Sequence, residues 1–312
     1  MTDADRDRLW RNFPRTAPEF EARFATEADC RAYWIEARWG GTPACARCAS
    51  TRLWPERAGR LFECADCGHQ TSLTSGTLLQ GTRKPFKTWF RAVFEISSRR
   101  NGISAKDLQR IMGFGSYETA WTWLHKLRAA LVRPDREPLS QQVQVDEAFV
   151  GGKRGGKEMV LVATETTDGR VRLAHADNND EATLRQFADA HVAVAAEVTT
   201  DGLASYNARS LGERPHAPIV QSNAERAEHD TLQGVHWTVS LLKRWLLGTH
   251  AGAVKPKHLQ AYLDEFAFRH NRRKTKGVGR IAARTLQQLV VHAPMTMRML
   301  VDDMHPCRAF RS

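Results

Sequence analysis

The sequence lacks any apolar run of about 18 residues, the length a helix needs to span a membrane. Its first residues also lack the basic-then-apolar pattern of a secretory signal, so we expect an intracellular, cytoplasmic protein. Only six cysteines occur in the 312 residues, and in a reducing compartment they argue for metal binding rather than for disulfides. No internal repeat is visible, which excludes a repeat architecture.

Positive charge, in contrast, is present in excess. Lysine and arginine total 46 against 35 aspartates and glutamates, which leaves a net charge of +11. A basic balance of this size favours polyanionic partners, with nucleic acid first among them. A basic surface that is merely solvated is the alternative that charge alone leaves open.

Four of the cysteines form two Cys-x-x-Cys pairs near the N-terminus. Cys45 and Cys48 make the first pair and Cys64 and Cys67 the second, with fifteen residues between the pairs. Two such pairs can close a tetrahedral site of four thiolates around one structural zinc ion, whereas a redox pair or four buried thiols are the alternatives. Four thiolates leave no open position for catalysis, so residues 41–82 are predicted to form a structural zinc ribbon.

Helical patterns lie on both sides of this predicted ribbon. Residues 1–40 are expected to be helical, and residues 85–133 are expected to form three helices. In the second of these three, Ser104 is the predicted N-cap and Gly113 the predicted break. A helix, a short glycine-bearing turn and a helix are typical of a helix-turn-helix that binds DNA, although an ordinary helical hairpin shows the same pattern. Residues 296–312 form a tail without a readable pattern.

From about residue 140 the pattern changes to an α/β layout, so the whole chain is predicted to be a multidomain α+β protein. Residues 140–295 are assigned to one α/β domain. A glycine-rich loop at 151–156 follows its first strand, but no Gly-Lys-Ser/Thr opens a helix there, and ATP is not expected as a ligand. Strands are predicted at 143–150, 159–165, 170–176 and 196–200, and helices at 180–192, 235–247 and 256–271.

Two aspartates of this domain are candidate metal ligands. Asp146 lies within the first strand and Asp201 directly follows the last one. Mg²⁺ prefers carboxylate oxygens, and two Mg²⁺ or Mn²⁺ ions in such a site can support the cleavage and transfer of phosphodiesters. Since neighbours in a strand face opposite ways, Glu147 should not bind the metals beside Asp146, and a supporting or structural role is predicted for it. Taken singly, each aspartate is more often a cap or a surface residue.

His236 and Lys243 lie seven residues apart in one predicted helix, which is about two turns. Both side chains therefore leave the same face, His236 as the candidate third metal ligand and Lys243 as a phosphate contact. A histidine that simply faces solvent is the alternative. Because imidazole is softer than Mg²⁺ prefers, Mn²⁺ is expected to support activity better than Mg²⁺. Trp237, Leu241 and Trp245 are predicted to face the core on another side of this helix.

Further basic residues are predicted to contact double-stranded DNA through its phosphates, which is a sequence-independent interaction. They cluster beside Lys243 and at the end of the last predicted helix. At that helix end the alternative is that the basic residues only interact favourably with the helix dipole. The predicted DNA contacts are Lys243, Arg244, Arg269, Arg272, Arg273 and Lys274.

Several stretches resemble bacterial insertion-sequence transposases that combine a zinc ribbon with a DDE-type catalytic domain of the ISXO-like kind. The resemblance covers roughly residues 15–292. It implies an RNase H-like catalytic fold, strand transfer from element ends into target DNA, and a homodimer or larger assembly in the bacterial nucleoid. Where many such enzymes place a third carboxylate, this chain has His236. The matching stretches are Val145–Lys153, Thr200–Gly202 with Tyr206, Ser240–Arg244 with Gly248–His250, and His258–Arg273.

We therefore predict a DDE-type DNA transposase in which Asp146, Asp201 and His236 hold the catalytic metals and Lys243 positions DNA. A non-catalytic DNA-binding regulator built from the zinc ribbon and the helix-turn-helix is one alternative, but it does not explain these four residues together. An RNase H-like nuclease that releases cut ends without joining them is the other.

Overall fold

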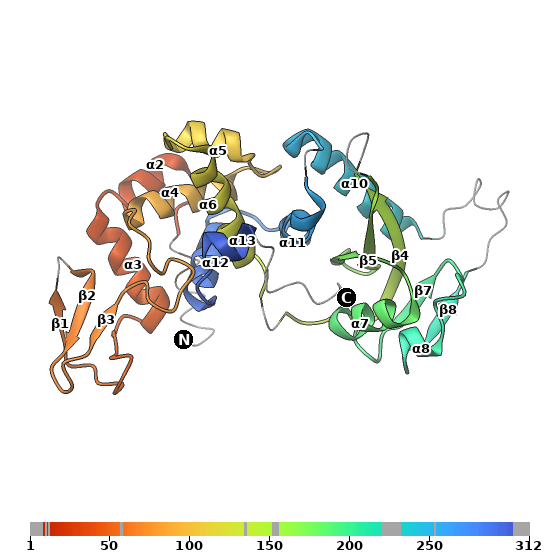
Figure 1. Cartoon of the computed structure of the whole chain (residues 1–312), viewed down its shortest axis with the longest axis horizontal. Coiled ribbons are helices and arrows are strands. Elements are labelled where there is room, and N and C mark those ends of the chain that lie inside the picture. The colour runs from red at the N-terminus through yellow and green to blue at the C-terminus, as the bar shows by residue number, and fades with distance from the viewer. Residues whose placement is uncertain are drawn as a thin grey trace. The chain divides into compact units, whose positions relative to one another are not determined.

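The computed structural model describes residues 9, 11, 13–56, 59–133, 136–151, 156–219, 232–252 and 254–301. The chain divides into two compact units, most of whose elements are labelled in Figure 1. The first unit contains the chain up to Leu131 together with Thr275–Leu300, and the second contains Val132–Lys274 and the chain from Val301. Residues 152–155 of the glycine-rich loop and Cys307 lie outside the described residues. None of the described helices is long and apolar enough to cross a membrane.

The helices of the first unit share one apolar core, which includes the fully buried Trp34, Phe90 and Leu124. Helix α12 comes late in the chain, yet it packs on α3, α4 and α6 through its buried side. The predicted end of the catalytic domain at residue 295 differs from this division, because α12 buries its apolar stripe in the first unit. The helices are α2 (Ala17–Arg23), α3 (Glu27–Trp39), α4 (Phe86–Ser98), α5 (Ala105–Met112), α6 (Tyr117–Ala130), α12 (Val278–Val291) and α13 (Met297–Val301).

Helices α5 and α6 are joined by the short turn that the sequence predicts. Ser104 caps α5, since its hydroxyl oxygen accepts a hydrogen bond from the amide of Asp107 at 3.1 Å. Gly113 ends the helix with a φ of 64°, a left-handed conformation that glycine adopts without strain. Most of α6 is buried, and its exposed residues are Tyr117 and Glu118 in the first turn. A helix-turn-helix that binds DNA stays a prediction, and this first turn is the part of α6 that could carry it.

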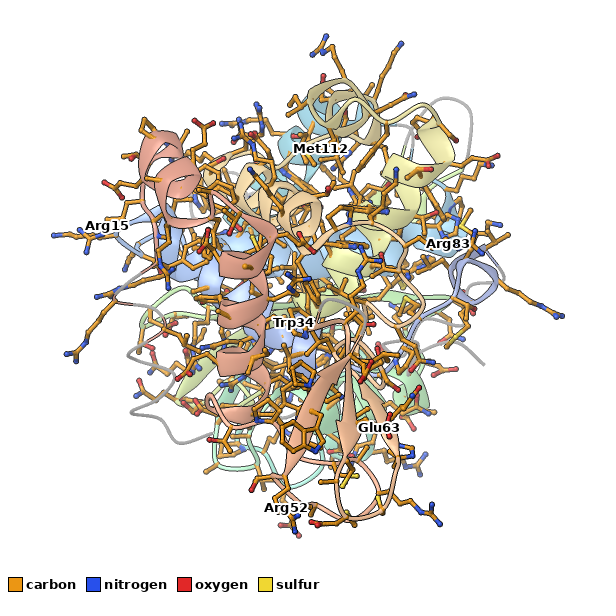
Figure 2. All side chains as sticks on the ribbon, turned by 90° about the vertical axis from the view of Figure 1, so that its left-hand side faces the viewer. Arg15, Trp34, Arg52, Glu63, Arg83 and Met112 are labelled. Atoms are coloured by element: carbon orange, nitrogen blue, oxygen red, sulfur yellow. The ribbon has the colours of Figure 1, made fainter. Side chains whose placement is uncertain are left out.

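The ribbon is a three-stranded antiparallel sheet in the order β1-β2-β3. Two side chains of α3, one helical turn apart, attach this sheet to the helix. The indole of Trp34 donates a hydrogen bond to the carbonyl of Leu73 at 2.7 Å, and Arg38 donates one to the carbonyl of Ser72 at 3.0 Å. Figure 2 shows Trp34 between α3 and the ribbon. The strands are β1 (Leu53–Glu56), β2 (Leu61–Cys64) and β3 (Gln70–Ser72).

The second unit is built on a five-stranded mixed sheet in the order β6-β5-β4-β7-β8. The pairs β4–β5 and β5–β6 are antiparallel, whereas β4–β7 and β7–β8 are parallel. This mixed α/β arrangement confirms the fold class predicted for the catalytic domain. Its elements are β4 (Gln142–Val150), β5 (Glu158–Glu165), β6 (Val171–Ala176), α7 (Glu181–His191), β7 (Glu197–Thr200), α8 (Ala208–Leu211), β8 (His216–Pro218), α10 (Gln233–His250), η2 (Pro256–His258) and α11 (Leu259–Asn271).

Helices cover both faces of this sheet, and strand alternation decides which residues each face receives. Val145 of β4 packs in the cluster that contains Phe187 of α7. Ala148 lies in the opposite cluster, with Leu242 of α10 and Leu263 of α11. Asp146 shares the face of Ala148, so it is turned towards the side of the sheet that α10 covers.

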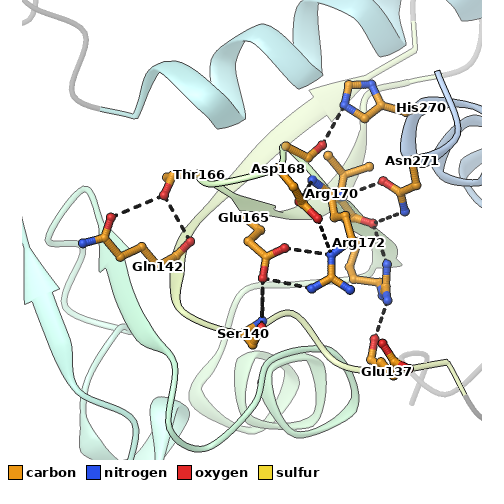
Figure 3. A network of polar contacts seen from close by, with 12 residues as sticks. Glu137, Ser140, Gln142, Glu165, Thr166, Asp168, Arg170, Arg172, His270 and Asn271 are labelled. Carbon is orange, nitrogen blue, oxygen red and sulfur yellow. Dashed lines mark hydrogen bonds and ion pairs between the residues drawn. The ribbon is translucent and has the colours of Figure 1, made fainter. Parts of the chain in front are cut away.

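A buried charge pair fixes the turn between β5 and β6 (Figure 3). The side chain of Glu165 is 2% exposed, and its Oε2 lies 2.7 Å from Arg170 Nε. Its Oε1 accepts a hydrogen bond from the amide of Ser140 at 2.8 Å. Burial alone would raise the pKa of Glu165, but the hydrogen bonds from Arg170 and Ser140 outweigh it and lower the pKa to about 2. A pKa depressed by folding means that the ionised carboxylate stabilises the folded state.

Replacing Glu165 with Gln should therefore lower the free energy of unfolding at pH 7 by about 1.5–3 kcal/mol, the range for hydrogen bonds to a charged group. The deficit should shrink as the pH falls from 4.5 towards 2, because wild-type Glu165 then loses its charge as well. Urea unfolding of both proteins over this pH range measures the effect, and the exposed Glu197→Gln serves as control. A deficit that stays constant down to pH 2 would contradict this account.

Candidate functional site

The four predicted zinc ligands converge in the ribbon. Their sulfur atoms all lie within 4.8 Å of one another, and among the described residues no other group of three or more His, Cys, Asp or Glu side chains is placed to hold a metal ion in this way. Cys45 Sγ lies 3.6 Å from Cys67 Sγ, and Cys48 Sγ lies 3.5 Å from Cys64 Sγ. Four sulfurs at about 2.3 Å from a tetrahedral zinc ion would be about 3.8 Å apart, so this donor set fits zinc.

Backbone amides prepare one of these thiols for metal binding. A hydrogen bond from the amide of Cys48, only partly opposed by burial, lowers the pKa of Cys45 to about 6. The amide of Arg47 also donates to Cys45 Sγ at 3.4 Å. Since the thiolate is the form that binds metal, this environment favours a metal ligand.

Strands β4 and β7 bring the two candidate aspartates side by side. The strands are parallel neighbours, and their last paired residues are Gln144 and Thr199. Continuing this register by two residues places Asp146 level with Asp201 on the same face of the sheet. Asp201 directly follows β7, where its Oδ1 accepts a hydrogen bond from the amide of Leu203 at 3.1 Å. Both aspartates therefore lie near the same edge of the sheet, where the charge of Asp201 contributes to the raised pKa of Asp146.

The imidazole of His236 reaches the same place from helix α10. Its Nε2 lies 3.4 Å from Asp146 Oδ2, with the His236 side chain 54% exposed and the Asp146 side chain 15% exposed. Burial, followed by the charge of Glu147, raises the pKa of Asp146 to about 6, and the charge of Asp201 acts in the same direction. Among the described residues no lysine or arginine pairs with Asp146. Clustered carboxylates of this kind are the environment that a divalent cation stabilises.

Glu147 points to the opposite face of the sheet, in line with strand alternation. Its Oε1 accepts a hydrogen bond from Asn179 Nδ2 at 2.9 Å, and its Oε2 accepts one from the hydroxyl of Tyr206 at 2.8 Å. Tyr206 belongs to the segment that follows Asp201, and Asn179 lies two residues before the start of α7. Glu147 therefore ties both segments to β4 next to Asp146, which is a supporting role.

The contact that fixes α10 on the sheet joins residues far apart in the sequence and is not among the predicted features. Gln144 Oε1 accepts a hydrogen bond from the amide of Gly234, in the first turn of α10, at 2.9 Å. A Cβ at position 234 would lie 2.8 Å from that oxygen and 3.3 Å from Thr164 Cγ2, so the close approach depends on glycine. Gln144 lies two residues before Asp146 in β4, so both side chains leave the same face of the sheet. This spacing was the signal in the sequence that Gln144 lies on the side of Asp146. The contact sets His236 against Asp146.

Lys243 and Arg244 lie on the solvent side of α10. Both are exposed, and neither forms a hydrogen bond or an ion pair with a described residue. Lys243 follows His236 by about two turns and is exposed like it, which agrees with the spacing argument. The two cations are therefore available to a polyanion that approaches the carboxylates.

Arg269 does not fit its predicted role as a DNA contact. Its side chain is 14% exposed, and its Nε and Nη2 lie 2.9 Å and 2.8 Å from Oε1 of the buried Glu265. The guanidinium thus neutralises a carboxylate inside the unit. The i,i+4 spacing of Glu265 and Arg269 on one helix was the signal in the sequence.

The remaining predicted cations at the end of α11 divide into two kinds. The guanidinium of Arg272 lies 3.9 Å from the ring centroid of Phe268, and that of Arg273 donates a hydrogen bond to the carbonyl of Gly169 at 3.1 Å. These contacts hold the helix end and the β5–β6 turn. Lys274 is exposed, so of these three it is the residue most available to phosphate.

The prediction that Trp237 faces the core is wrong, since its side chain is 63% exposed. Leu241 and Trp245 are partly buried against the core, as predicted. Trp237 follows Val235 by two residues, which is about 200° around the helix, and so it points away from the sheet. The buried positions of α10 are Val235, Thr238, Leu242 and Leu246.

Comparisons with known proteins agree with this division into ribbon and catalytic domain. The transposase zinc-ribbon domain matches residues 25–70, and the ISXO2-like transposase domain matches residues 138–271. The first match contains α3 and all four clustered cysteines, and the second contains Asp146, Asp201 and His236. No curated protein matches the chain.

Among solved structures, the chain is similar to one in the cryo-EM structure of the simian T-cell lymphotropic virus intasome in complex with PP2A regulatory subunit B56 gamma. The identity is 14%, the match covers 51% of this chain and 67% of that chain, and the TM-score is 0.32. A likeness this distant carries no argument about this protein. From its two domain matches, the chain belongs to the ISXO2-like insertion-sequence transposases with an N-terminal zinc ribbon.

Proposed function

We propose that the protein is a catalytically active transposase, which binds the ends of its insertion sequence, cuts them and joins them to target DNA. In this reaction water attacks a phosphodiester at the element end and releases a 3′-hydroxyl. That hydroxyl then attacks a phosphodiester of the target and displaces a new 3′-hydroxyl. Each P–O bond that breaks is replaced by one that forms, so the chemistry needs no ATP.

This proposal is supported by the 3.4 Å contact between His236 Nε2 and Asp146 Oδ2, and by the position of Asp201 directly after β7, the parallel neighbour of β4. These residues would hold two divalent ions, Mg²⁺ or Mn²⁺. Such ions, when bound, activate the attacking oxygen and stabilise the leaving oxygen. Carboxylate oxygens suit either ion, while the imidazole nitrogen favours Mn²⁺. The ribbon would hold one structural zinc ion.

The exposed cations would hold the DNA. Lys243 and Arg244 leave the solvent side of α10, and Lys274 follows α11. Each can neutralise a phosphate, which gives affinity without reading sequence. Because joining requires the two ends of the element together, we expect a homodimer or a larger assembly on DNA.

An assay of cleavage and joining tests the proposal. The purified full chain, loaded with zinc, would be mixed with the DNA that flanks its gene and with a supercoiled plasmid, in Mg²⁺, Mn²⁺ or EDTA. We expect metal-dependent 3′-hydroxyl ends that become joined to the plasmid, with Mn²⁺ at least as effective as Mg²⁺.

Two other outcomes would contradict the proposal. Tight DNA binding without cleavage in either metal would identify a regulator or an inactive transposase. Metal-dependent cleavage with no joined product would identify a nuclease. Neither result would affect the zinc ribbon or the fold.

Replacing Gly234 with Ala should slow cleavage by roughly 10-fold or more, the size of effect seen when a group that orients a metal ligand is lost. The new Cβ would displace Gln144 Oε1 and press on Thr164, which shifts the first turn of α10 and His236 with it. Cleavage rates at saturating DNA, together with circular dichroism to verify folding, measure this effect.

Gly248→Ala is the matched control on the same helix, because a Cβ at that position meets no atom within 4 Å. It should leave cleavage unchanged and stabilise the helix slightly, since alanine has the higher helix propensity. Equal rates for both variants would show that the close approach at Gly234 does not position His236.

A further inference from the structure

The outer side of α10 presents a large aromatic ring that packing does not explain. Trp237 is 63% exposed, while the buried positions of the helix are occupied by other residues. Scattered exposed apolar residues are normal in proteins and need no explanation alone. The surroundings of this one distinguish it, since it directly follows His236 and lies on the helix that carries Lys243 and Arg244.

Helix geometry places these groups in two neighbouring lines. His236 and Lys243 are seven residues apart, as are Trp237 and Arg244, and each interval is about two turns. The two lines are about 100° apart around the helix, and all four residues are exposed. The accessible indole of Trp237 therefore lies next to His236, which contacts Asp146. Lys243 and Arg244 follow about two turns later on the same helix, and neither pairs with a described residue.

We propose that Trp237 stacks on an unpaired base of the DNA strand whose phosphodiester is cut, while Lys243 and Arg244 contact phosphates of that strand. Indole rings stack on any base, and cations beside them hold the backbone, so such a surface fits a single strand rather than a closed duplex. Extruding a base from a duplex costs free energy, and stacking of that base on Trp237 would offset this cost. This inference rests on the proposed transposase function and assigns the form of DNA that the site accepts.

Binding without catalysis tests the proposal. The zinc-loaded full chain would be titrated in EDTA-free, magnesium-free buffer with a fluorescein-labelled oligo(dT) single strand and with a duplex of the element end. Trp237→Ala should weaken single-strand binding by about 5- to 150-fold, the range for one stacked base. Trp237→Phe should retain most of the affinity, and duplex binding should change less than about twofold, since phosphate contacts dominate there.

Leu247→Ala is the matched control, because Leu247 is 70% exposed on the same helix and is given no role in DNA binding. An equal loss in this variant, or unchanged single-strand binding by Trp237→Ala, would overturn the proposal. A change of oligomeric state with unchanged single-strand affinity would assign Trp237 to a subunit interface instead.

A second arm separates this inference from the proposed function. Trp237→Ala should cut an intact element end more slowly than wild type but cut a substrate with mismatched bases at the cleavage site at nearly the wild-type rate. Equal slowing on both substrates would overturn the stacking role while leaving the transposase function in place. If no protein cuts either substrate, the proposed catalysis fails, and the binding difference still decides the role of Trp237.

Discussion

Replacing Asp146 with Asn should abolish cleavage and joining, with a loss well beyond about 100-fold, while DNA binding persists. Losing a group that only orients a metal ligand lowers metal affinity or activity by about 10- to 100-fold. Asp146 is proposed to bind the metal itself, so its loss should lower activity further. The amide keeps the shape of the side chain and can still accept the hydrogen bond from the amide of Glu147 at 2.8 Å. Cleavage assays in Mn²⁺ and Mg²⁺, with binding measured in parallel by gel shift, show whether chemistry alone is lost.

Stability separates a lost reaction from a lost fold. Asp146 is a largely buried carboxylate beside Glu147 and near Asp201, so its charge is poorly solvated and repelled in the metal-free protein. In EDTA, Asp146→Asn should therefore unfold at a temperature no lower than wild type. Adding Mn²⁺ should raise the unfolding temperature of wild type but not of the variant.

Glu197→Gln is the control, because this carboxylate is exposed on β7, the same strand that leads to Asp201. It should keep both cleavage and the response to Mn²⁺. Residual cleavage by Asp146→Asn within tenfold of wild type would remove Asp146 from the catalytic centre, and the carboxylate cluster would then need another explanation.

Features that depend on local spacing could be predicted from the sequence. The cysteine pairs converge because each pair spans one tight turn, and the intervening residues form the hairpin that closes the site. Asp146 and Glu147 separate to opposite faces because a strand alternates with period two. Ser104 caps its helix through a bond that reaches only three residues along the chain. In each case the deciding contact lies within a few residues or one hairpin.

Features that depend on distant contacts could not be predicted in the same way. Gln144 and Gly234 are joined by a hydrogen bond although they lie ninety residues apart in the sequence, and no pattern in either segment predicts this contact. The i,i+4 spacing of Trp237, Leu241 and Trp245 predicts one apolar side of the helix, yet the surface that a helix covers decides which of its sides is buried. The burial of α12 in the first unit likewise depends on helices formed far earlier in the chain.

Removing one zinc ligand, with Cys64→Ser, should unfold the ribbon while the catalytic unit stays folded. Binding of a structural zinc ion supplies about 10–16 kcal/mol in isolated zinc modules, far more than a three-stranded sheet with so little apolar core can supply itself. Metal analysis should fall from one zinc per chain to none, and limited proteolysis should cut between Cys45 and Ser72. The unfolding transition of the second unit should not move, because its clusters contain no ribbon residue.

Two further variants make this prediction specific to the metal. Cys67→His should retain zinc, because three cysteines and one histidine also form a tetrahedral site. Cys30→Ala should retain it as well, since Cys30 is buried in α3 and is not part of the cluster. Ribbon protection that survives in Cys64→Ser without zinc would mean that Trp34 and Arg38 hold the sheet to α3 unaided. If the ribbon unfolds only when zinc is lost, its fold is coupled to the metal, and DNA binding that disappears with it would place part of the DNA-binding surface on the ribbon.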